Sequence, residues 1–287
     1  MIGEFSALGA AIAWAGGSTI IKPVAERLKP LPLNVIRNST AWLFLTLALL
    51  PFGKLGEVKG IPSESFLYIA LSGVIGLVIG TTIYIKALGM ASISRVYTIS
   101  TGSWILWSCL LAVLFLGEGF KIYTGMGAAL ILLGIALLSE SPEGRKKGER
   151  AGIILAFTTG ICWGVGIAFL KLGLEGADPL IVNVIRLPFV FLLLFLLSLR
   201  GGGFRAYGEF KRGDLLRAGG GGVLDQVVAS VLYFFAIKLS GAAKATILAS
   251  SSPLFIVPLA LLLGERITPR IIAGTLVCTV GIWLTII

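Results

Sequence analysis

The chain has 287 residues, of which 56% are hydrophobic and only 13% are charged. Soluble domains carry about 25% charged residues, so this composition excludes a soluble globular enzyme, a disordered chain and a collagen-like rod. The net charge is +10, with no His, but the basic residues stand in short gaps between apolar runs. That scatter speaks against nucleic-acid binding and favours the loops of a membrane protein.

Ten apolar runs are each long enough to cross a membrane, because the hydrocarbon layer of about 30 Å requires a helix of about 20 residues. Strands of a β-barrel would alternate apolar and polar side chains, whereas a run such as 43–50 is almost wholly apolar. The sequence therefore predicts an all-α integral membrane protein with ten transmembrane helices. The predicted spans are 4–22, 33–51, 66–87, 93–116, 121–139, 151–171, 179–199, 216–238, 243–263 and 269–287.

An internal repeat relates the two halves of the chain. At a shift of 149 residues, the tetrapeptide 34–37 falls on 183–186 with all four residues identical. After a two-residue slip the shift becomes 147, which brings Ser103 onto Ser250. The order of the matches indicates a duplication. Further identities at the first shift are Trp14 with Trp163, Gly17 with Gly166, Lys22 with Lys171, and Tyr84 with Tyr233.

The repeat predicts a five-helix unit over 1–139, a polar linker at 140–150 and a second five-helix unit over 151–287. Five is an odd number, so the second unit must enter the membrane from the opposite side. The two units then form inverted repeats about a pseudo-two-fold axis in the membrane plane. Alternating-access carriers have this architecture, and their binding site lies near the midplane between the repeats.

Two such halves, each with an early Trp, an Arg early in the second helix and a Gly-Glu after the fourth, resemble the EamA family of the drug/metabolite transporter superfamily. The residues that carry the resemblance are Trp14 and Trp163, Arg37 and Arg186, and Glu118 and Glu265. The resemblance spans the whole chain, one unit per half. It implies a ten-helix transporter of small organic molecules, often an exporter of amino acids or other metabolites. It leaves the substrate open.

Ten spans place both termini on one side of the membrane. Six Lys and Arg residues fall in the loops on the side of the termini and sixteen in the loops on the other side. Because cytoplasmic loops collect Lys and Arg, this asymmetry places both termini outside a plasma or inner membrane. The first residues carry no basic cluster, so we expect no cleaved signal peptide.

Asp225, beside Gln226, stands well inside the eighth predicted span. A charged side chain at the bilayer centre costs about 2.5–3.5 kcal/mol or more, so it usually faces a cavity or the bundle interior. In a chain without His, Asp225 is the candidate for proton coupling or for contact with a substrate amine. The alternative is a structural carboxylate paired with a nearby base. The first half has Gly76 and Leu77 at the matching positions, so either role is asymmetric.

Arg37 and Arg186 are candidates to gate or relay an anionic group, and an Asn precedes each by three residues, on the same helix face. The alternative is snorkelling to the interface or bonding to helix-end carbonyls. The other candidates to line a substrate cavity are aromatic or hydroxyl side chains at mid-span, for which bundle packing is the alternative. They are Trp14, Tyr84, Ser103, Trp163, Tyr233, Ser250 and Ser251.

Cys109, Cys162 and Cys278 are scattered inside apolar runs, and the chain has no phosphate-binding loop or cluster of metal ligands. We therefore expect no cofactor, no metal, no catalytic residue and no nucleic-acid partner. The predicted function is a secondary carrier of a small organic metabolite such as an amino acid, with membrane lipid as its surroundings and protons as the candidate coupling ion. The alternatives are a carrier of phosphorylated or nucleotide-linked solutes, an integral-membrane lipid-processing enzyme, and a pore.

Overall fold

The computed structural model describes residues 1–115, 122–139, 148–173, 178–200, 204–240 and 242–286, and this part of the chain is helical without strands. The first half holds α1 (Ile2–Ala25), α2 (Pro30–Leu49), η1 (Leu50–Phe52), η2 (Lys54–Gly60), α3 (Ser63–Ser72), η3 (Gly73–Gly80), α4 (Thr81–Met90), α5 (Ile93–Phe115) and α6 (Ile122–Ser139). The second half holds α7 (Glu149–Gly173), α8 (Pro179–Arg200), α9 (Arg205–Gly208), α10 (Arg212–Val223), η4 (Leu224–Val228), α11 (Ala229–Ser240), α12 (Ala242–Ala249), α13 (Ser252–Leu262) and α14 (Pro269–Ile286).

Eight helical segments of the described residues are long and apolar enough to cross a membrane. An all-helical, multi-pass architecture is thus confirmed, and α1 and α5, with 24 and 23 residues, also have transmembrane length. The eight are Pro30–Phe52, Ser63–Met90, Ile122–Ser139, Glu149–Gly173, Leu180–Arg200, Arg212–Ser240, Ala245–Leu262 and Pro269–Ile286.

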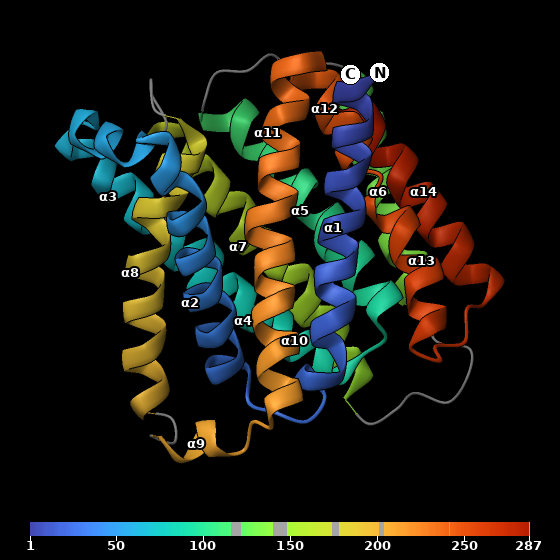
Figure 1. The fold of residues 1–287 in the computed structure, drawn as a ribbon. Coiled ribbons are helices and arrows are strands. Elements are labelled where there is room, and N and C mark those ends of the chain that lie inside the picture. Colours follow the sequence, from blue (N-terminus) through green and yellow to red (C-terminus); the bar gives the residue numbers. More distant parts are fainter. Residues whose placement is uncertain (116–121, 140–147, 174–177, 201–203, 241, 287) are drawn as a thin grey trace.

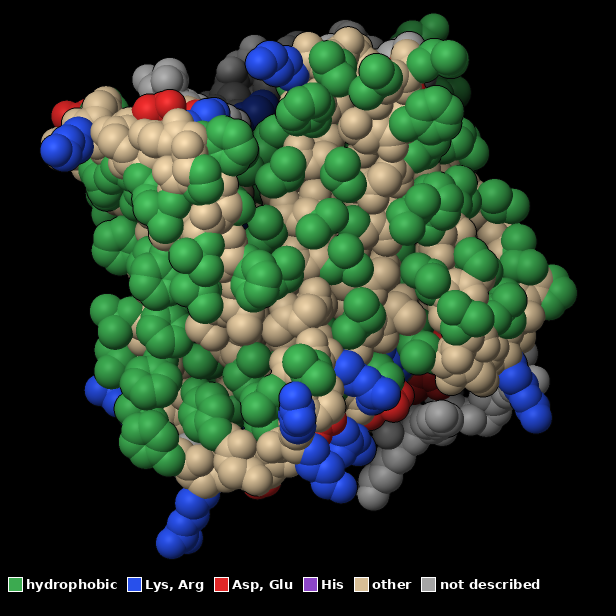
Figure 2. All heavy atoms as spheres, viewed as in Figure 1, with side chains coloured by type: hydrophobic (Ala, Val, Ile, Leu, Met, Phe, Trp, Pro, Cys, Tyr) green, Lys and Arg blue, Asp and Glu red, His purple; other side chains and the backbone are tan. Residues whose placement is uncertain are grey.

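The surface matches a lipid environment around the middle of the molecule. Figure 2 shows hydrophobic side chains covering the middle of one face, over α8, α2, α11 and α1. Lys and Arg side chains gather mainly at the end away from the two chain termini, which lie together at the other end (Figures 1 and 2). A belt of exposed apolar side chains between two polar ends is what a multi-pass protein requires.

The first helices of the two halves run in opposite directions. Ser18 of α1 bonds to Tyr84 of α4, and Lys22 one turn later bonds to the carbonyl of Leu88, so α1 runs parallel to the segment Ser63–Met90.

Helix α7 packs against the same segment in the reverse order. Trp163 lies beside Gly80, whereas Gly173, nearer the end of α7, lies beside Ile69, nearer the start of the segment. Helix α7 is therefore antiparallel to this segment, and α1 and α7 oppose each other. This is the relation that an inverted repeat requires.

Packing partners are exchanged between the halves. Helix α1 packs against α10, η4 and α11 of the second half, and α7 packs against α3, η3 and α4 of the first half. The pairs α2–α8 and α6–α14 join helices that occupy equivalent positions in the two repeats. The two halves thus interlock, and neither forms a separate bundle (Figure 1).

Both copies of the third span contain a π-helical turn at the same place. The first runs over Gly73–Gly80 and the second over Leu224–Val228, and a shift of 149 places the second inside the first. A π-helical turn widens the helix locally and is frequent at functional sites. The sequence patterns did not predict this feature.

The ninth expected span, 243–263, is interrupted in the structure. Helix α12 ends at Ala249 and α13 begins at Ser252, with a turn at Ser250 and Ser251. Pro253 at the start of α13 has no backbone N–H to donate, which accounts for the break. Three short helices, η1, η2 and α9, were not predicted from the sequence. Of the expected linker 140–150, residues 140–147 lie outside the described residues, as do Gly117 and Glu118.

Asp178 fastens the start of α8 to the first half. Its carboxylate accepts the backbone N–H of Leu180 at 2.8 Å and the Lys54 ammonium at 2.5 Å. Burial raises the Asp178 pKa, but the bonds from Lys54 and Leu180 outweigh that effect, so the pKa lies below its ordinary value of 3.8. The charged carboxylate therefore stabilises the fold at any pH above its ordinary pKa. This contribution is lost as the pH falls through the lowered pKa.

We predict that Asp178→Ala lowers the free energy of unfolding by about 1 kcal/mol near neutral pH, because a helix cap and a partly exposed ion pair are lost together. Thermal unfolding of the purified protein at neutral and at acidic pH measures this. The difference from wild type should vanish in acid. Lys54→Ala, which removes only the ion pair, should have the smaller effect, and an equal or larger effect would contradict the capping role.

Candidate functional site

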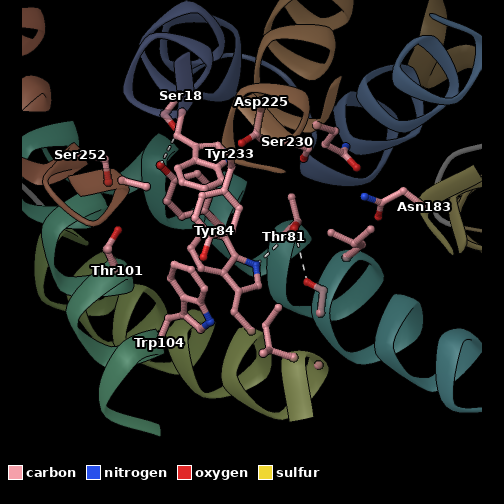
Figure 3. A pocket seen from close by; sticks show the side chains of 18 of the residues that line it. Ser18, Thr81, Tyr84, Thr101, Trp104, Asn183, Asp225, Ser230, Tyr233 and Ser252 are labelled. Atoms are coloured by element: carbon pink, nitrogen blue, oxygen red, sulfur yellow. Dashed lines mark hydrogen bonds between the residues drawn. The ribbon is translucent and has the colours of Figure 1, made fainter. Parts of the chain in front are cut away.

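A cavity of about 230 Å³ lies where the two halves meet. Both π-helical turns contribute to its wall, together with residues of α1, α2, α3, α4, α5, α7, α8, α11, α12 and α13. This volume lies slightly below the range of about 300–1,000 Å³ that is usual for ligand pockets, so it suits a small solute. Aromatic, hydroxyl and charged side chains all face it (Figure 3).

The wall of the cavity repeats at the shift of 149 residues. Most lining residues form pairs of which both members face the cavity, so equivalent positions of the two repeats build its wall. The shift of 149 residues also holds for Thr101 and Ser250, which both line the cavity. The sequence comparison instead matched Ser250 with Ser103, at a shift of 147. The pairs are Trp14/Trp163, Ser18/Ile167, Arg37/Arg186, Gly76/Asp225, Leu77/Gln226, Thr81/Ser230, Tyr84/Tyr233, Tyr97/Thr246 and Thr101/Ser250.

Each half contributes a Trp that packs on a Tyr of the other half. The ring centroids of Trp163 and Tyr84 are 5.1 Å apart, and those of Trp14 and Tyr233 are 5.5 Å apart. The Tyr84 hydroxyl donates to Ser18 at 2.9 Å, and the Tyr233 hydroxyl contacts the Thr246 hydroxyl at 2.7 Å. These two aromatic pairs are therefore fixed in orientation as well as packed, and all four rings line the cavity.

Arg37 and Asp225 form an ion pair across the two halves. Arg37 on α2 donates to the Asp225 carboxylate at 2.6 Å, and its side chain is only 3% exposed, whereas that of Asp225 is 28% exposed. The carboxylate is thus paired with a base, as the alternative for Asp225 had it, and it also faces the cavity. The Nε and one further guanidinium nitrogen of Arg37 have no partner among the described residues.

Arg186, the repeat of Arg37, has neutral partners only. It donates to the Asn183 side-chain oxygen at 2.7 Å and to the Ser72 hydroxyl at 3.2 Å. Its Nε is buried without a partner, and no carboxylate of the described residues pairs with it. The reason is in the sequence, because Gly76 takes the position that corresponds to Asp225.

A chain of hydrogen-bonded amide side chains holds Gln226 in one orientation. It donates to Asn38 at 3.2 Å, and Asn38 donates to Asn34 at 2.8 Å. Asn34 in turn donates to the carbonyl of Leu77 in the first π-helical turn at 2.9 Å. This chain ties α2 to the third span of each half. Asn183, the counterpart of Asn34 in the second half, lies in the cavity wall instead.

Ser103 and Ser251 do not line the cavity, unlike the other residues that the sequence singled out. Ser103 donates to the carbonyl of Phe157 at 2.8 Å and is fully buried between α5 and α7. Ser251 lies in the turn between α12 and α13 and donates to the carbonyl of Ile247. For Ser103 the structure shows packing between helices, and for Ser251 a bond within its own segment.

The two Lys residues of the repeat differ in their surroundings. Lys22 is buried and donates to the carbonyls of Leu88 and Ala91 at the end of α4, at 2.5 and 2.8 Å. The backbone of Ala25 also lies close to Gly89 there, so α1 and α4 are packed tightly beyond the cavity. Lys171 is exposed, and in the described residues α7 and α11 share no comparable interface.

Two lining residues, Ser18 and Thr81, were not selected from the sequence as candidates. Ser18 and Thr81 accept hydrogen bonds from Tyr84 and from the Trp163 indole, respectively. Their signal was available, because they stand one helical turn from Trp14 and close to Tyr84. Trp104 lines the cavity, and its indole N–H has no partner in the described residues. Among the described residues there is no group of three potential metal ligands.

The comparisons with known proteins agree with this geometry. The model of the EamA-like transporter family matches residues 1–140 and again residues 150–287. No curated protein matches the chain significantly. One solved structure, titled only "Crystal structure of protein", has a TM-score of 0.65 at 15% identity over 98% of this chain and 95% of its own. At that identity the likeness concerns the fold alone.

Proposed function

This chain belongs to the EamA-like transporter family, and from that premise we propose that it is a secondary carrier of a small organic solute that works by alternating access. The family is one of multi-pass membrane transporters rather than enzymes, within the drug/metabolite transporter superfamily. In this proposal α1 and α5 complete ten spans, arranged as two inverted five-helix repeats. The cavity between the repeats is the transport site.

The single observation that carries the proposal is the symmetry of the cavity wall. A binding site between two inverted halves can open to either side of the membrane when the two halves exchange their packing arrangements. Trp14 with Tyr233 and Trp163 with Tyr84 are equivalent pairs that would exchange surroundings in such a step. A membrane enzyme has no need for a site with this symmetry.

The described conformation is closed at one end in this proposal. Lys22 and the close packing of α1 on α4 seal the cavity toward the end away from the termini. The described residues of α7 and α11 share no comparable interface. The cavity would then open toward the end where both termini lie (Figure 1). Since Lys and Arg gather mainly at the closed end, that end is cytoplasmic in our proposal, and the termini are outside a plasma or inner membrane.

Asp225 is the proposed coupling residue. It is the carboxylate of the cavity wall and lies within the π-helical turn of the second half, and among the described residues only Arg37 pairs with it. Protonation of Asp225 would release Arg37, which connects the ion pair to the packing of α2 on η4. Coupling to protons and facilitated exchange are both compatible with the family. Transport of the substrate against its concentration gradient distinguishes proton coupling from exchange.

Counterflow in proteoliposomes tests the proposal. Vesicles loaded with a mixture of unlabelled amino acids and other small metabolites should accumulate the labelled form of the transported solute transiently, and the rate should saturate. Trp163→Ala should reduce this uptake at least about tenfold, because a large contact surface is removed from the cavity. Flux without saturation or counterflow would indicate a pore and would contradict the proposal.

A further inference from the structure

We propose that the solute is anionic and that Arg186 binds its carboxylate. This inference rests on the proposed function, because it takes the cavity as the transport site. It follows from the juxtaposition of an aromatic wall with a guanidinium that has no acidic partner among the described residues, both in one cavity.

The charge of the cavity wall is unbalanced. The charged residues that line it are Arg37, Asp225 and Arg186. The first two neutralise each other at 2.6 Å, so one positive charge is left, on Arg186. A partly buried guanidinium without an acidic partner is unfavourable because its loss of hydration is not repaid by an opposite charge. A bound anion supplies that charge.

The imbalance arises at one position of the repeat. Asp225 neutralises Arg37 from the third span of the second half, and Gly76 is its equivalent opposite Arg186. A Cβ on Gly76 would meet only the Cα of Gly166, at 3.7 Å, which is an ordinary contact. The space that an acidic side chain occupies in one half is therefore left to the cavity in the other half.

The donors of Arg186 are arranged for a ligand. Asn183 and Ser72 hold two of its nitrogens with neutral oxygens, which fixes the plane of the guanidinium, and its Nε has no partner. Arginine binds carboxylates through paired N–H donors, so an acid that displaces the weak 3.2 Å bond to Ser72 gains charge-assisted bonds.

The rest of the wall indicates an apolar body on the ligand. Figure 3 shows Tyr84, Tyr233 and Trp104 on one side of the cavity, with Asn183, the partner of Arg186, on the other. A single free guanidinium fits a monoanion. A phosphate ester carries up to two charges. Lys22, the buried Lys of the repeat, bonds to two carbonyls and to Glu26 outside the cavity wall. The favoured class is thus a small carboxylic acid that carries one negative charge and an apolar or aromatic body.

The test compares an acid with neutral and cationic molecules of the same shape. Purified protein in phosphatidylcholine nanodiscs, which offer no anionic lipid, is titrated calorimetrically with 3-phenylpropionate, 3-phenylpropanamide and 3-phenylpropylamine in a low-chloride buffer. We expect the acid to bind at least about tenfold more tightly than the amide, which corresponds to about 1.4 kcal/mol. The amine should bind most weakly of the three.

Two variants remove the free charge in different ways. Arg186→Gln deletes the guanidinium, and Gly76→Asp supplies the missing carboxylate opposite it. Both should reduce the affinity for the acid at least about tenfold while leaving the affinity for the amide within about threefold of wild type. Gly76→Asn is the matched control, because it has the shape of Asp without the charge. It should retain the preference for the acid, which also shows that Gly76→Asp did not act through misfolding.

Three results would overturn the inference. They are equal binding of acid and amide by the wild type, no binding of the acid at any accessible concentration, and equal loss of acid binding in Gly76→Asp and Gly76→Asn. Counterflow of a neutral or cationic solute together with any of these results would leave the carrier function standing and refute only the anion site. Absence of counterflow with preference for the acid would instead count against the carrier function alone.

Discussion

Asp225→Asn is expected to abolish uphill transport and to lower the free energy of unfolding by about 3–5 kcal/mol. Removing one partner of a buried ion pair leaves the other charge uncompensated. Arg37 is 3% exposed, and two of its nitrogens already have no partner in the described part of the chain. Thermal unfolding in detergent measures the stability. Uptake of the solute found by counterflow, driven by a pH gradient across proteoliposomes, measures the transport.

The double variant Arg37→Gln with Asp225→Asn separates the two effects. Both charges are then absent, so most of the lost stability should return, whereas uphill transport should stay absent because no group of the pair can be protonated. Downhill exchange should survive in the double variant. Normal uphill transport by Asp225→Asn would remove this carboxylate from the mechanism and leave the pair a structural one.

Gly134→Val is the second change with a large expected effect. Helices α6 and α14 cross with their backbones in contact, and a Cβ on Gly134 would meet the backbone N and Cα of Cys278 at 2.8 and 2.9 Å. Backbone atoms cannot move aside as a flexible side chain can, so we expect a loss of about 3 kcal/mol in stability and a lower yield of folded protein.

Ala129→Val on the same helix is the control for Gly134→Val. Ala129 is exposed, so the added methyl groups face lipid and should change the melting temperature little. A shift of similar size in both variants would show that β-branching within α6, and not contact with α14, determines the effect. Thermal unfolding monitored by circular dichroism decides between the two.

The periodicity and the repeat predicted most of the fold, for a physical reason. A helix in lipid must satisfy its backbone hydrogen bonds within itself. Each span is therefore a continuous apolar run of the sequence and can be recognised without tertiary information. The break between α12 and α13 and the π-helical turns are local deviations. Of these, only the break has a visible signal, Pro253, and the apolar run across it hides that signal.

The candidate site was predictable only in part. Aromatic and charged residues at equivalent positions of the two halves, such as Trp14 and Trp163, could be selected. A cavity between duplicated halves is lined by equivalent residues of both, so the sequence shows each of them twice. The pairing of Arg37 with Asp225 joins residues 188 positions apart and depends on which helices face each other. Ser103 illustrates the limit, since a buried hydroxyl satisfied by a neighbouring carbonyl has the same sequence signal as one that faces a cavity.

The most direct test of the account is the accessibility of the cavity from each side of the membrane. In a background with Cys109, Cys162 and Cys278 replaced by Ala, Thr81→Cys and Ser230→Cys place one thiol at equivalent positions of the cavity wall. Ser103→Cys, outside the wall, is the unreactive control. A membrane-impermeant thiol reagent should label each cavity thiol when added to either side of proteoliposomes, without any leak of the reagent across them. Labelling from one side only under all conditions would contradict alternating access.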